Sequence, residues 1–234
     1  MALRTKDGQC GMILLKLGRR AHLEELRRGL LYMNPLSHFR SLEEDPARRD
    51  DREGDDYILQ PEHANLVIET GILDLGRISA APGDLAGPIR MGRYRTRLCN
   101  LFCMFAITGP VERPMFAADH CWPGDSFVLF THTQEFVSRV GSAAHKGGLR
   151  MECGLVEYYD DSKYSGSVGR FRKPSKFSYQ SEFRIVLEPG SDQAVRLQIG
   201  ELTNITSGVM PLERADDVLK FGAKDLKADG IQWD

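Results

Sequence analysis

Short apolar runs recur along the chain, separated by polar and glycine-rich segments. The runs at residues 12–17, 98–107 and 127–130 are typical of buried strands because each is short and nearly continuous. Residues 133–144 instead place Phe136, Val137 and Val140 on one face of a helix. Weaker patterns predict helices at 19–29 and 36–42, paired strands within 65–75 and further strands at 30–33, 154–159 and 183–187. We therefore predict one α+β domain over residues 1–234, with a mixed or mostly antiparallel sheet of short strands and a few helices.

Two stretches lack a clear hydrophobic period. Residues 43–56 contain eight acidic residues and three arginines, which is too polar for a core and favours a surface loop. Residues 76–97 are rich in glycine, proline and arginine, and we predict a long loop there. Since long loops often carry function, both stretches are candidates for binding or catalysis.

The overall composition is that of an ordinary globular domain. The 234 residues include 31 Lys+Arg and 33 Asp+Glu, a formal net charge of -2, which excludes a strongly basic nucleic-acid coat. The longest apolar run, residues 98–107, is shorter than the roughly 18 residues of a membrane span, and residues 1–9 lack the apolar core of a secretory signal. We expect a cytoplasmic protein without a membrane partner, whose five cysteines are mostly reduced and structural.

Residues 173–187 give the strongest chemical signal. If a strand begins near Tyr179, its period of two places Gln180, Glu182 and Arg184 on one face, while apolar residues occupy the other. One interpretation is a sheet face turned to water, in which Glu182 and Arg184 pair with neighbouring strands. The other is a carboxylate at the mouth of a cleft, with an amide two residues before it.

The Gln180-x-Glu182 spacing resembles the signature of ADP-ribosyltransferases. The resemblance implies that Glu182 binds the 2′-hydroxyl of the nicotinamide ribose of NAD and that Gln180 positions a protein or nucleic-acid acceptor. A carboxylate beside an ordered ribose would stabilise the oxocarbenium-like state formed when the nicotinamide bond breaks. The same resemblance implies an ADP-ribosyltransferase-like fold.

The residues expected to hold NAD lie elsewhere in the sequence. In the family that the motif resembles, a basic residue near the end of the first strand grips the dinucleotide, and Arg19 and Arg20 occupy that place here. Thr131 matches a hydroxyl-bearing strand that lines the same pocket, and Tyr179 is an aromatic candidate. This hypothesis requires Arg19 or Arg20, Thr131 and Glu182 to converge on one cleft.

A second resemblance extends over roughly residues 12–210. The segments 31–39, 49–54, 155–159 and 176–184 look like a widespread bacterial domain family of unknown function, with an early Asp-x-x-Glu-Gly and a late Lys followed by Glu-x-Arg. Some such domains occur among toxins and phage-defence proteins, which implies a nucleotide or nucleic-acid substrate. The resemblance marks five candidate residues: Asp50, Glu53, Lys176, Glu182 and Arg184.

Two other function classes stay open. The acidic residues of 50–56 could hold Mg²⁺ for a metal-dependent phosphodiesterase together with Glu182 and Lys176, but their spacing matches no compact metal site, and we expect no metal. Alternatively, the basic segments 90–97 and 163–176, which contain interleaved aromatic residues, could form the surface of a non-catalytic module that binds nucleic acid or protein. An NAD-dependent ADP-ribosyltransferase-like enzyme is the leading hypothesis.

Overall fold

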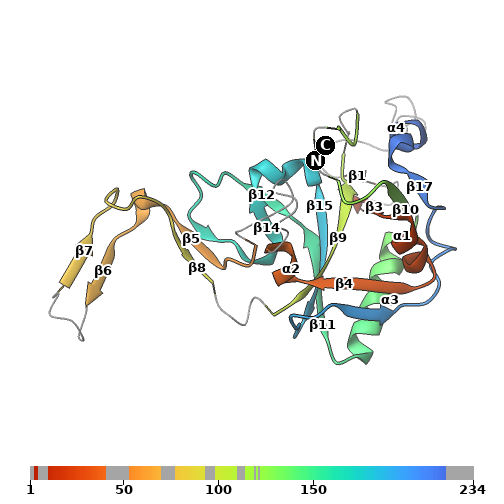
Figure 1. Cartoon of the computed structure of the whole chain (residues 1–234), viewed down its shortest axis with the longest axis horizontal. Helices are drawn as coiled ribbons and strands as arrows, with labels where there is room; N and C mark the ends of the chain where they lie inside the picture. The colour runs from red at the N-terminus through yellow and green to blue at the C-terminus, as the bar shows by residue number, and fades with distance from the viewer. Residues whose placement is uncertain are drawn as a thin grey trace.

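An eight-stranded antiparallel sheet forms the centre of the protein (Figure 1). The computed structural model describes residues 3–4, 10–40, 53–69, 77–92, 98–109, 114–118, 120 and 122–219. The main strand order is β11-β15-β9-β3-β10-β17, and β4 and β16 extend the sheet from β9. These strands are β3 (Ile13–Gly18), β4 (Leu30–Pro35), β9 (Asn100–Ile107), β10 (Ser126–Phe130), β11 (Arg150–Leu155), β15 (Glu182–Glu188), β16 (Val195–Gln198) and β17 (Met210–Pro211). The predicted α+β class with mostly antiparallel strands is confirmed.

Two helices cover one face of this sheet. Helix α1 (Arg20–Arg27) buries Leu23 and Leu26, and α3 (Thr133–Lys146) buries Phe136, Val140 and Ala144. These side chains belong to the largest apolar cluster, to which β9, β10 and β15 contribute alternate residues. The periodicity of 3.6 in the helices and of two in the strands therefore generates this core directly from the sequence.

The opposite face is covered by short strands and 3-10 turns. The parallel pair β12 (Glu157–Tyr159) and β14 (Arg172–Pro174) lies there, with η3 (Gly169–Phe171) and η4 (Ser175–Gln180). Two smaller apolar clusters lie on this face, one around Leu15, Phe105 and Phe127 and one around Leu101 and Val186.

A long β-ribbon projects from the body (Figure 1). We call residues 57–91 the arm. Its base is the three-stranded sheet of β13 (Gly166–Ser167), β5 (Tyr57–Leu59) and β8 (Ile89–Met91), and its outer part is the pair β6 (Leu66–Glu69) and β7 (Arg77–Ala80). The expectation of an aperiodic loop over residues 76–97 is wrong in part, since β7 and β8 lie within it. The short elements not yet placed are β1 (Leu3–Arg4), β2 (Cys10–Gly11), α2 (Leu36–Arg40), η1 (Pro61–His63), η5 (Leu212–Arg214) and α4 (Ala215–Val218).

No helix within these described ranges is long and apolar enough to cross a membrane.

Candidate functional site

The charged residues of β15 are buried in the interior. Glu182 and Arg184 share one face of the strand, as the sequence predicted, because alternate residues of a strand point the same way. They lie beside Phe105 and Cys103 of the neighbouring β9. Glu182 is 6% exposed and Arg184 only 1%. The interpretation of a polar face turned towards water is therefore wrong. Both charges are paired, but not with the neighbouring strands β9 and β11: their partners are Glu53, Lys173 of β14 and each other.

Arg184 binds Glu53 through two parallel hydrogen bonds. Its Nη1 and Nη2 donate to Oε1 and Oε2 of Glu53 at 2.7 and 2.8 Å, and Nη1 also donates to the carbonyl oxygen of Arg170. Glu53 is separated from Arg184 by 131 positions in the sequence and comes from the segment that leads into the arm. This bidentate geometry is the strongest form of a carboxylate–guanidinium contact, and it attaches the start of the arm to the sheet.

Glu182 is held between two cations. Its Oε1 lies 3.2 Å from Nε of Arg184, and its Oε2 lies 3.1 Å from Nζ of Lys173, a residue of β14. The same Lys173 ammonium donates a hydrogen bond of 2.8 Å to Oε1 of Gln180. Gln180 and Glu182 are thus connected through a lysine. We call Glu53, Lys173, Gln180, Glu182 and Arg184 the buried charge network.

Each ion in this network is stabilised by its partners. Burial alone would raise the pKa of Glu182, but the charges of Arg184 and Lys173 outweigh it and hold that pKa well below its usual value. Burial would lower the pKa of Lys173 and of Arg184, and the nearby Glu182 and Glu53 raise both instead. Glu182, Lys173 and Arg184 therefore remain charged near neutral pH.

Two further residues complete the surroundings of Glu182. The backbone N–H of Glu182 donates to the hydroxyl of Tyr158 at 2.9 Å, and burial, reinforced by the Glu182 charge, raises the pKa of Tyr158. The partly buried Cys103 lies beside the same carboxylate, and the desolvation of its thiol raises its pKa. Both pKa shifts favour the protonated forms of these groups at neutral pH.

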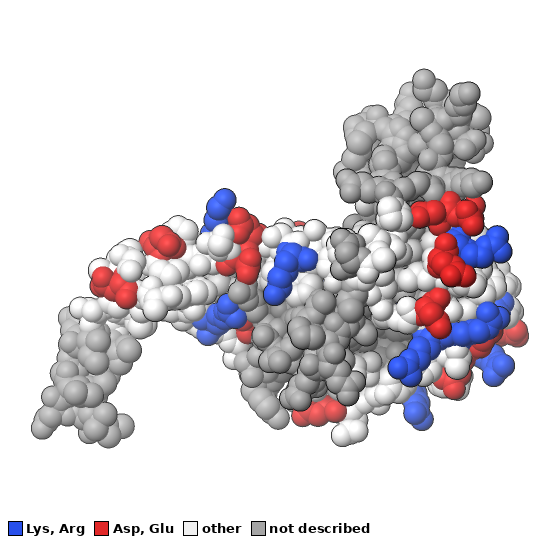
Figure 2. All heavy atoms as spheres, turned by 45° about the horizontal axis from the view of Figure 1, so that its top comes forward, with Lys and Arg blue, Asp and Glu red and all other residues white. Residues whose placement is uncertain are grey.

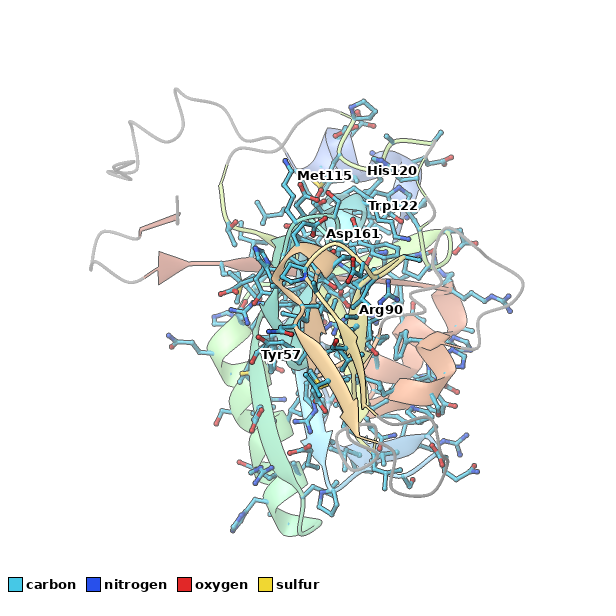
Figure 3. All side chains as sticks on the ribbon, turned by 90° about the vertical axis from the view of Figure 1, so that its left-hand side faces the viewer. Tyr57, Arg90, Met115, His120, Trp122 and Asp161 are labelled. Carbon is cyan, nitrogen blue, oxygen red and sulfur yellow. The ribbon has the colours of Figure 1, made fainter. Side chains whose placement is uncertain are left out.

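Tyr179 lies in an aromatic cluster beside the network. Its ring stacks on His120 with 4.1 Å between ring centroids and meets Trp122 edge-on at 5.4 Å. In the view from the arm's side, His120 and Trp122 lie close to Met115, above Tyr57 and Arg90 at the base of the arm (Figure 3). The expected strand start at Tyr179 is wrong. Tyr179 and Gln180 belong to η4, and Ser181, with a φ of 39°, turns the chain before β15 begins.

The structure separates the remaining residues expected to bind NAD. Arg19 and Arg20 follow the end of β3, where this strand lies beside the start of β10, whereas Thr131 follows the end of β10. The paired region from Ser126 to Phe130 spans roughly 13 Å at about 3.3 Å per residue, and the arginines and Thr131 lie beyond its opposite ends. All three residues are exposed, and Arg20 pairs with Glu24 of its own helix at 3.8 Å. The expected convergence of Thr131 with Arg19 or Arg20 is not observed.

The structure brings together only some of the candidates from the second resemblance. Glu53, Glu182 and Arg184 meet in the network, but Lys176 is exposed and lies 4.9 Å from the ring of Phe177. The lysine that contacts Glu182 is instead Lys173, three residues earlier in the sequence. Asp50 lies outside the described residues.

The structure also bears on the metal hypothesis. The Arg184 guanidinium lies between Glu53 and Glu182 and contacts both carboxylates. Within the part of the chain that the structure describes, no group of three or more His, Cys, Asp or Glu residues is arranged to hold a metal ion.

Sequence reasoning missed Lys173, Tyr158 and Cys103. All three reach Glu182 through strand pairing: β15 pairs with β9, and Lys173 and Tyr158 lie opposite each other in the β12–β14 pair. The local signals were that Tyr158 and Cys103 fall within the predicted strands 154–159 and 98–107, and that Lys173 begins the segment 173–187.

Comparison of the chain with models of protein families, with curated proteins and with solved structures gives no significant match.

Proposed function

We propose that the chain is a protein-binding module whose recognition element is the arm. The proposal rests on the exposed apolar side chains of the arm, a ribbon that projects from the body. Among the described residues, five large apolar side chains are exposed, and two of them, Val67 at 42% and Met91 at 49%, belong to the arm. A ribbon that projects into solvent gains little stability from such residues, so we interpret Val67 in the outer pair and Met91 at the base as contact points for a partner that covers the length of the arm.

The charge of the arm favours a protein partner over a nucleic acid. Residues 57–91 contain four acidic residues, Glu62, Glu69, Asp74 and Asp84, but only two arginines, Arg77 and Arg90. On the part of the arm that is not drawn in grey, Figure 2 shows separate acidic groups on a largely uncharged surface. Nucleic-acid binding depends on cations placed against phosphates. The net negative charge of this ribbon would repel the phosphates of a nucleic acid.

The base of the arm is firmly attached to the body. Besides the Glu53–Arg184 pair, Nε2 of Gln60 donates to the carbonyl oxygens of Asp161 and Tyr164, each at 3.0 Å. The backbone N–H of Val168 donates to the carbonyl of Asp56 at 2.9 Å. Such anchoring lowers the entropy that a binding element loses on association, so the buried charge network contributes to binding by positioning the arm.

Site-specific photo-crosslinking tests this function. A benzophenone amino acid at Val67 should give adducts of discrete mass in cells that express the protein. The matched control is the same substitution at Leu155, an apolar residue of β11 with 47% exposure. Adducts at Val67 and none at Leu155 would support the proposal. The absence of adducts at Val67 would overturn it.

NAD chemistry is a second candidate, favoured by one contact. Lys173 connects Gln180 to Glu182, which unites the two residues of the motif resembling that of ADP-ribosyltransferases. For this function a ribose hydroxyl would have to replace Lys173 at Oε2 of Glu182. Arg19, Arg20, Thr131 and Tyr179 remain predictions as NAD-binding residues, as does a role in toxicity or phage defence.

Release of nicotinamide from NAD by the purified protein tests this second function. The release should disappear in Glu182→Gln and persist in Glu157→Gln, which alters an exposed carboxylate paired with Arg172. Gln180→Ala provides a second variant if Glu182→Gln fails to fold. Absence of nicotinamide release, with and without added protein, RNA and DNA, would exclude NAD cleavage as the activity.

A further inference from the structure

The outer part of the arm has two unpaired strand edges. β6 and β7 pair with each other over four positions, from Leu66 beside Ala80 to Glu69 beside Arg77. Within the described ranges, no further strand pairs with either of them. Their outward N–H and C=O groups can therefore accept another strand, and an isolated two-stranded ribbon is only marginally stable in water.

We propose that the arm's partner is a second copy of this chain, with β6 of one protomer pairing antiparallel with β6 of the other across a two-fold axis at Val67. This inference rests on the proposed function, because it names the protein that the arm binds. The pairing would convert two ribbons into one four-stranded sheet and would satisfy the outer edge of β6 in both copies.

The sequence of β6 is compatible with this symmetric pairing. A two-fold axis at Val67 places Leu66 opposite Ile68 of the second copy and Asn65 opposite Glu69. Aliphatic positions thus meet aliphatic positions, and no two like charges stand directly opposite each other. A two-fold axis requires self-complementarity of this kind, whereas an unrelated partner does not.

The outer ribbon carries little charge. At the end of β6, the register places Glu69 beside Arg77 of β7, and Asp74 of the intervening sequence leaves one net negative charge on each ribbon. Repulsion between two single net charges on exposed ribbons is weak and is screened by salt, so it does not prevent the approach of two copies. Pairing of four strand positions is small compared with a standard interface, so we expect a dissociation constant on the order of micromolar.

Analytical ultracentrifugation of the full chain over a range of concentrations tests the proposal. The wild-type protein should change from monomer to dimer as its concentration rises to about 200 µM, well above the expected micromolar constant. In Val67→Lys, two lysines would face each other across the axis, and the dissociation constant should rise at least about tenfold. Leu155→Lys is the matched control and should dimerise like the wild type. A monomeric wild type at every concentration would overturn the proposal.

A charge exchange makes the test specific to a two-fold axis at Val67. Val67→Lys and Val67→Glu should each dimerise more weakly than the wild type when alone, because like charges meet across the axis. An equimolar mixture should restore the dimer, because opposite charges then meet. Since Val67 is 42% exposed, both variants should keep the wild-type fold, which circular dichroism checks. Failure of the mixture to recover dimerisation would overturn the β6 pairing.

The two proposals fail in distinguishable ways. A monomeric wild type that still gives Val67 adducts with a different protein would disprove self-association and leave protein binding standing. A monomeric wild type without any Val67 adduct would disprove both.

Discussion

The two faces of the central sheet are both buried, but by different means. On the helix side, β15 contributes Phe183, Ile185 and Leu187 to the apolar cluster beneath α1 and α3. On the other side, the same strand contributes Glu182 and Arg184, which are as inaccessible as the apolar residues. One strand therefore serves an apolar core on one face and a charged interior on the other.

This difference determines what each face can specify. Apolar contacts are not directional, so the helix side needs the right volume and shape. The buried charges must keep their partners, because an unpaired ion in the interior costs several kcal/mol. The charged face therefore fixes which segments meet there: the start of the arm through Glu53 and β14 through Lys173. Directional pairing on this face sets the place where the arm leaves the body.

Arg184→Met should cause the largest loss of stability. It leaves Glu53 and Glu182 buried without their guanidinium, and breaking such a network costs about 3–5 kcal/mol in the free energy of unfolding. Denaturant titration measures it, with Arg196→Met, an exposed arginine of β16, as the control. A change below about 1 kcal/mol would mean that the ions are not paired in solution.

Ile185→Ala should cause a somewhat smaller loss on the helix side. Ile185 is fully buried, and truncation of a buried isoleucine costs about 2–5 kcal/mol. The distinction from Arg184→Met lies in pH: the cost of Ile185→Ala should stay constant with pH, since no charge changes. A cost that varied strongly between pH 4 and 8 would contradict the division between the two faces.

The charged face should instead give an acid-labile contribution. The pKa of Glu182 is lower in the folded chain than its ordinary value of 4.5, so its stabilisation is fully present above that value and is lost as the pH falls towards the folded pKa. Below about pH 5, the wild type should therefore lose stability more steeply than Glu182→Gln. Urea titrations at several pH values measure the two slopes, and parallel slopes would show that Glu182 is not ionised in the fold.

The sequence predicted the apolar face of the sheet better than the charged face. Phe183 and Ile185 followed from alternation within a single strand, and Phe136 and Val140 of α3 followed from helical spacing. Local periodicity records these positions because each element needs one apolar face.

The charged face depends on contacts between segments that are distant in the sequence. Glu53 meets Arg184 across 131 positions, and Lys173 reaches Glu182 only because β12 and β14 pair side by side. No local pattern distinguishes Lys173 from Lys176. The left-handed backbone at Ser181, which ends η4 before β15, was also hidden, since such a φ is uncommon for a residue other than glycine.

Tyr158→Phe should cause a moderate loss of stability, because it alters the charged face without removing a charge. It removes the hydroxyl that accepts the N–H of Glu182, without removing a charge, and should cost about 1 kcal/mol in unfolding free energy. Thermal unfolding would record this as a decrease of roughly 2–4 °C for a chain of this size. Tyr32→Phe, at an exposed tyrosine of β4, is the control and should leave the unfolding temperature unchanged.

Arg20→Ala should have the smallest effect, because this arginine lies outside both buried faces. Its side chain is exposed and its pair with Glu24 lies on one helix surface, a contact worth less than about 0.5 kcal/mol. The variant should therefore unfold like the wild type, which makes it a clean probe of ligand binding. If NAD is a substrate gripped by Arg20, the KM for NAD rises in this variant although stability does not change. An unchanged KM in a protein that does cleave NAD would remove Arg20 from the site and leave Arg19 as the remaining basic candidate after β3.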